Sequence, residues 1–177
     1  MATRAASSGD DTAAADPVQA LRSLAAVRQA LEGGELPRAE LVGFLVEALA
    51  AIESGEDPAH ALGLALAAGQ EHPARTLARE RRDAWLAAAL EATDGATTWA
   101  RARALAAAVG EFQARRWPRW RAWAEPPGHA TDQQRALFQA ARVAEAAGLQ
   151  LPTSAKALAA LSPHGSEMRV FPSTPAR

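Results

Sequence analysis

TTWARARALAAAVGEFQARRWPRWRAW, residues 97–123, holds four of the five tryptophans of the 177-residue chain. Thr97 or Thr98 can cap a helix here, because a side-chain oxygen at the N-cap accepts a hydrogen bond from a free backbone N–H of the first turn. Apolar residues then recur every three or four positions, the spacing of one helical face: Trp99, Ala102, Leu105, Ala106, Val109 and Phe112. The segment therefore predicts an amphipathic helix with one buried face.

Three further tryptophans extend this buried face. At 100° per residue, Trp117, Trp120 and Trp123 span about 120°, and the preceding apolar stripe falls inside that arc. Pro118 interrupts the pattern, because it lacks an N–H and its ring clashes with the carbonyl of Ala114, so we expect a kink or a restart there. Packing of the indoles in the core is the favoured interpretation. A partner surface, or an interface with nucleic acid or membrane, stays open.

Capping and stop signals predict further helices on both sides of this segment. Asp-Pro pairs start helices at residues 17 and 58, and Thr131 with Gln134 forms a capping box that starts another, ended by Gly148. The first two helices, 17–32 and 37–54, each show one apolar face, and Leu31 and Leu49 are expected to be buried. The other predicted helices cover residues 59–68, 73–91 and 154–161. The segment 59–68 is apolar nearly all round and is therefore expected to be central.

Composition supports the same fold class. Alanine supplies 48 residues and the β-branched Val and Ile only eight, so an all-α chain is favoured over a β fold. We predict an irregular or orthogonal bundle of six to seven helices that forms a single domain over 16–161. Residues 1–15 and 162–177 are expected to be a disordered arm and tail. The large apolar residues are few, so the core should be lean.

Several classes of protein are excluded or disfavoured. Cysteine is absent, which excludes disulfides, thiolate catalysis and Cys-containing zinc sites. No apolar segment approaches the roughly 20 residues that cross a bilayer, and residues 1–16 lack the apolar stretch of a secretory signal, so a cytoplasmic protein is expected. No two of the four histidines have the spacing of a helical metal site, and no nucleophile elbow or phosphate loop occurs. We expect no metal, no cofactor and no enzymatic activity.

Charge is unevenly distributed along the chain. Net charge is −7 over residues 1–72, +5 over 73–123 and +1 over 124–177. The arginines of the basic part are the candidate surface for a protein partner or a nucleic acid, because guanidinium groups pair with phosphates and indoles stack on bases. These candidates are Arg75, Arg79, Arg82, Arg115, Arg116, Arg119 and Arg121. For Arg75, Arg79 and Arg82, which share one helical face, the alternative is a solvated face or pairing with acids of the first two helices.

Four segments resemble proteins encoded in proteobacterial genomes and prophages: DPAHALGL (57–64), TTWARARALAAAVGEF (97–112), WPRW (117–120) and LPTSAKAL (151–158). The similarity covers about residues 36–161. It implies a phage-linked, intracellular origin and supplies no activity or functional residue.

The sequence thus favours a non-enzymatic accessory protein that presents a helical surface to a protein partner. Binding of DNA or RNA without sequence preference, through residues 75–123, is the alternative. Neither the partner nor the oligomeric state follows from the sequence.

Overall fold

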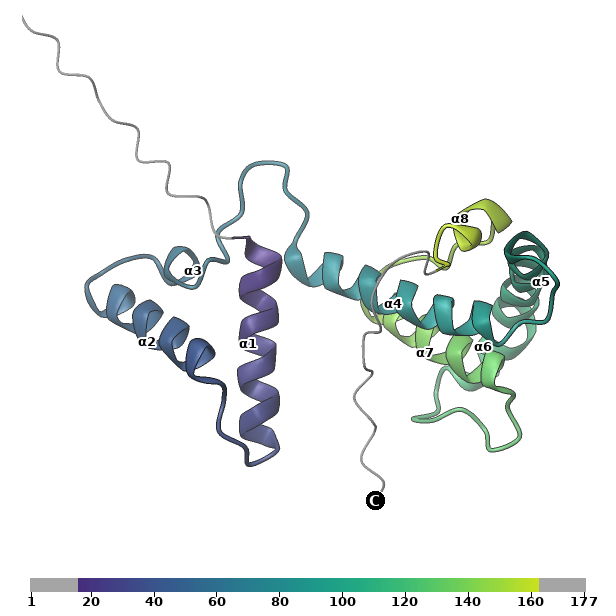
Figure 1. The fold of residues 1–177 in the computed structure, drawn as a ribbon, viewed down its shortest axis with the longest axis horizontal. Coiled ribbons are helices and arrows are strands. Elements are labelled where there is room, and N and C mark those ends of the chain that lie inside the picture. Colours follow the sequence, from purple (N-terminus) through teal and green to yellow (C-terminus); the bar gives the residue numbers. More distant parts are fainter. Residues whose placement is uncertain (1–15, 163–177) are drawn as a thin grey trace, which may run out of the picture. The chain divides into compact units, whose positions relative to one another are not determined.

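A computed structural model describes residues 16–162, and the chain is helical without strands over this range (Figure 1). Its elements are α1 (Pro17–Glu32), α2 (Ala39–Glu53), α3 (Pro58–Ala61), α4 (Pro73–Glu91), α5 (Thr98–Glu111), the π-helical turn η1 (Phe112–Arg116), α6 (Trp117–Trp120), α7 (Asp132–Ala146) and α8 (Ala155–Ala159). Because α5, η1 and α6 follow one another without a gap, the described part has seven continuous helical stretches. The predicted all-α fold of six to seven helices is confirmed. The predicted arm, and the tail beyond its first residue, lie outside the described residues.

Contacts within the chain group it into two compact units, residues 1–77 and 78–177, and the boundary falls inside α4. Below, unit 1 means the described residues 16–77, and unit 2 means 78–162. The predicted single domain over 16–161 stays a prediction.

Local capping rules explain where most helices begin. The Asp16 carboxylate accepts a hydrogen bond from the Val18 N–H at 3.0 Å, with Pro17 in the first turn. Asp57 accepts from two backbone N–H groups at the start of α3 in the same way. Thr131 and Gln134 form the predicted capping box of α7. Each pairing satisfies backbone donors that a helix terminus otherwise leaves without partners.

Pro118 is preceded by the π-helical turn η1, which ends two residues before it. The Trp117 N–H donates to the carbonyl of Phe112, five residues back, so η1 carries one extra residue in its turn. We attribute this wider turn to Pro118, because in a regular α-helix its ring would clash with the carbonyl of Ala114, four residues before it. The regular α-helix expected to kink or restart at Pro118 instead passes through a π turn directly into α6.

The π turn brings the aromatic residues of unit 2 together. The ring of Phe112 lies 5.7 Å from that of Trp120, edge to face, and 6.2 Å from that of Trp117. Phe138 of α7 packs on the same cluster, 5.8 Å from Trp117. Leu86, Leu90, Leu105, Leu137 and Leu158 surround this cluster and are fully buried. The core of unit 2 thus draws on α4, α5, η1, α6, α7 and α8.

Several sequence-based burial predictions are wrong. Trp99 and Trp123 are 53% and 46% exposed, because Trp99 lies in the first turn of α5 and Trp123 follows the end of α6, where helical spacing no longer applies. Leu31 and Leu49 are also exposed, since α1 and α2 bury little of each other. The predicted central helix 59–68 is reduced to α3, which has no buried residue.

The cluster predicts where stability is concentrated. Phe112→Ala and Trp120→Ala should each lower the free energy of unfolding by about 3–5 kcal/mol, because large buried aromatics leave cavities when removed. Trp99→Ala is the matched control and should change it by less than about 1 kcal/mol. Urea unfolding followed by circular dichroism measures all three. Unchanged stability of the Trp120 variant would contradict the core assignment.

Candidate protein interface

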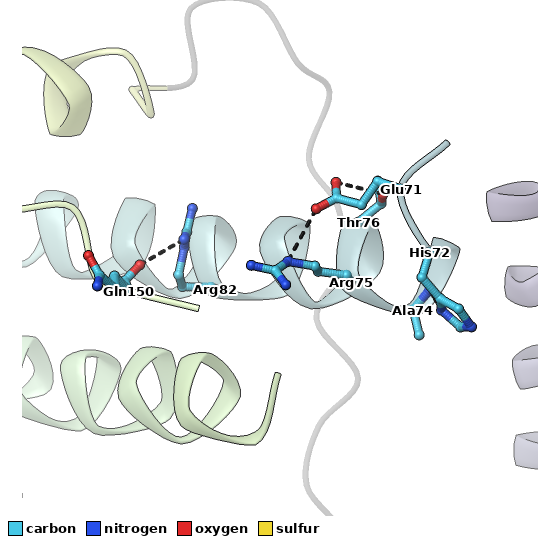
Figure 2. A network of polar contacts seen from close by, with 7 residues as sticks. All are labelled: Glu71, His72, Ala74, Arg75, Thr76, Arg82 and Gln150. Carbon is cyan, nitrogen blue, oxygen red and sulfur yellow. Dashed lines mark hydrogen bonds and ion pairs between the residues drawn. The ribbon is translucent and has the colours of Figure 1, made fainter. Parts of the chain in front are cut away.

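Three of the predicted arginines lie on α4, and each of them interacts with other groups of the chain. Arg75 forms an ion pair with Glu71, with Nε and Oε1 3.3 Å apart, and the Thr76 hydroxyl donates to the same carboxylate (Figure 2). Arg79 also interacts within the chain. The regular spacing of these arginines on one helical face therefore does not create a row of unoccupied cations.

Arg82 is a structural residue of unit 2. Its Nη1 donates to the carbonyl of Gln150 at 2.8 Å, and Nε and Nη2 reach the Asp83 carboxylate at 2.8 and 2.7 Å. Its side chain is only 14% exposed. Figure 2 shows it reaching from α4 to the segment that follows α7. Arg82 therefore holds the segment between α7 and α8 against α4 and is not free to bind a ligand.

The four arginines around α6 divide into two pairs. Arg116 faces Glu111 at 3.7 Å and lies over the Trp120 ring, and Arg121 faces Glu145 at 3.7 Å. Arg115 and Arg119 are exposed and have no partner within the described part of the chain. For Arg75 and Arg82, the described partners are Glu71, Asp83 and Gln150, none of which belongs to the first two helices.

A row of exposed apolar side chains lies on α2, which the sequence-based prediction did not single out. Val42, Val46 and Leu49 are 43%, 59% and 56% exposed. Their spacing of four and three residues places them in one row, here called the α2 apolar face. Unit 1 exposes two further leucines, Leu31 in the last turn of α1 and Leu36 in the connection to α2.

The same helix contacts its own unit through a different face. Ala48 is buried, and Leu41, Leu45 and Ile52 are half-buried. A helix that is apolar on most of its circumference is usually buried on most of it. That property is the signal in the sequence that could have found this surface: α2 carries only three charged residues.

Electrostatics set α2 apart from the helices of unit 2. Its charged residues, Glu40, Glu47 and Glu53, are all acidic and exposed, and they have no partner within residues 16–162. Unit 1 holds four arginines against nine acidic residues, a net charge of −5. The α2 apolar face is thus accompanied by negative charge that nothing described in the chain neutralises.

A groove of 690 Å³ lies beside this helix, between one side of α1 and the start of α2. It is lined by Gln19, Arg22, Ser23, Gln29, Glu35, Leu36, Arg38, Glu40 and Leu41, among others. Both polar and apolar side chains line it. The groove therefore adds a recess with hydrogen-bonding groups to the apolar surface of unit 1.

Within residues 16–162, no three acidic or histidine side chains gather where they could hold a metal ion. None of the helices in that range is long and apolar enough to span a membrane. Comparison with known proteins found no matching family model, curated protein or solved structure.

The two kinds of arginine should differ in stability measurements. Arg82→Ala is expected to lower the free energy of unfolding by about 1–2 kcal/mol, because it removes charge-assisted hydrogen bonds that join α4 to Gln150. Arg119→Ala, at an exposed site without a partner, should stay within about 0.5 kcal/mol of the parent. Parallel urea titrations make the comparison, and equal effects would contradict the structural role of Arg82.

Proposed function

We propose that this protein is a non-enzymatic interaction protein that docks on a protein partner through the α2 apolar face. The observation that carries the proposal is the contrast in unit 1 between burial and exposure. Its buried residues are Ala20, Val27, Ala48 and Pro73, and none of these is a large apolar side chain. Its larger exposed apolar residues are Leu31, Leu36, Val42, Val46, Leu49 and Leu66.

Energetic reasoning supports a partner for this unit. Small folding units bury too little surface to be stable alone and usually need an added support such as association. Full burial of one Val or Leu contributes about 1.5–3 kcal/mol, so covering three half-exposed side chains yields roughly 3 kcal/mol in all. Contiguous exposed apolar residues of this kind typically mark protein contacts.

The proposal includes a cytoplasmic location and a phage or prophage link. The lack of cysteine is compatible with a reducing compartment. The resemblance of four segments to proteins of proteobacterial genomes and prophages supports the link.

Photo-crosslinking in the producing cells tests the proposed function. A benzophenone amino acid replaces Val46 in one variant and Trp99, a similarly exposed residue of unit 2, in the control. We expect one discrete crosslinked protein from position 46 and none from position 99. The crosslinked partner is then identified by mass spectrometry and purified. It should bind the parent chain, and its affinity for the Val46→Gln/Leu49→Gln variant should be at least about tenfold weaker. Crosslinks of equal pattern at both positions would contradict the proposal.

A second candidate function, binding of single-stranded nucleic acid, is favoured by one observation. Arg115 and Arg119 are exposed without partners, and the half-exposed Trp123 follows Arg119 by four residues. Trp123 stacks on Trp120 with ring centroids 6.3 Å apart, so it is held as a flat surface. Arginine and a fixed indole are the elements of a base-stacking site.

Binding of the purified chain to single-stranded and duplex DNA, at low and high salt, separates the two functions. The interaction function predicts no retention even at low salt. Retention that weakens steeply as salt rises, and that Arg115→Ala/Arg119→Ala reduces, would favour the nucleic-acid function.

A further inference from the structure

We infer that the occupant of the α2 apolar face is a basic amphipathic helix of another protein. The inference rests on the proposed function and names the chemistry of its partner. Shape and charge support it independently.

The shape of the surface suits a helix. Val42, Val46 and Leu49 repeat at the spacing through which amphipathic helices dock on one another. Next to this row, in the helical projection, lie Ala39, Gly43 and Ala50. A Cβ added at Gly43 would meet no atom within 4 Å, so the space above it is open. A partner helix can therefore approach the backbone of α2 closely on this side.

The charged residues around the α2 apolar face are acidic and therefore favour a partner that carries basic side chains. In the helical projection, Glu40 and Glu47 lie beyond Gly43, and Glu53 continues the row past Leu49. In unit 2, by contrast, Glu111 and Glu145 have arginine partners. Lysine or arginine side chains beside the apolar stripe of a partner can lay their stems along the surface and reach these carboxylates.

A second copy of the chain fits this surface less well. In a symmetric antiparallel contact centred between Val46 and Glu47, Glu40 faces Glu53 of the other copy, and the two Glu47 residues lie next to each other. Facing like charges at an interface are unfavourable, and α2 offers no basic residue to compensate. The charge pattern therefore favours a different, basic partner over self-association.

Two synthetic 18-residue helical peptides test the inference against the full-length chain. Both carry the same leucine stripe; one has arginine and the other glutamate at its polar positions. Fluorescence anisotropy at low and high salt gives the affinities. We expect the basic peptide to bind at least about tenfold more tightly at low salt, with the difference shrinking as salt screens the charges.

Variants assign the two contributions to residues. Gly43→Leu fills the open space and should weaken binding of the basic peptide, as should Val46→Gln/Leu49→Gln. Glu40→Gln/Glu47→Gln should remove most of the preference for the basic peptide. The matched control Asp94→Asn/Glu125→Gln removes two exposed acids without partners in unit 2 and should leave the preference unchanged. Circular dichroism of each variant confirms that it is folded.

Each result has a definite meaning. Equal binding of both peptides, lost in Val46→Gln/Leu49→Gln, would overturn the basic partner and leave the docking surface in place. No binding of either peptide would overturn both the inference and the docking surface. A dimer in sedimentation that Val46→Gln dissociates would overturn the inference in favour of a second copy.

Discussion

Packing of Trp120 against Phe112 is the contact on which unit 2 depends. The two residues face each other because Pro118 prevents a regular helix and the chain responds with the π turn η1. The same turn presents Trp117 to Phe138, which joins α6 to α7. In a chain whose apolar residues are mostly alanine, these few large rings supply much of the buried surface. The geometry at one proline thus organises the core formed by five helices and the π turn.

The two units use similar building blocks with opposite results. Unit 2 encloses its large side chains and pairs several of its arginines with nearby carboxylates. Unit 1 buries little more than alanine, exposes valine and leucine on α2, and leaves the carboxylates of that helix without partners among the described residues. The folded core of unit 2 and the proposed docking surface of unit 1 therefore occupy different parts of the chain. This division is the physical basis of the proposed function.

The interleaved arginines and tryptophans near α6 include both buried core residues and exposed residues. Trp120 is buried, and Arg116 lies over its ring while facing Glu111, so this part of the motif is architecture. Arg115, Arg119 and Trp123 remain accessible. Residue type alone does not separate these roles. The π turn does, because it changes which side chains face the core beyond Phe112.

Sequence by itself determined the helical class, the starts of α1, α3 and α7, and the break before Pro118, because caps and proline sterics act within a few residues. Only the tertiary structure decided which faces are covered. Leu49 has the spacing of a buried residue and is exposed, and Arg82 has the spacing of a surface stripe and is held by Gln150. Burial and side-chain pairing depend on elements that are distant in the chain. Helical periodicity does not indicate which of these elements packs against a given face. The apolar circumference of α2 was visible in the sequence, whereas the side of it left open was not.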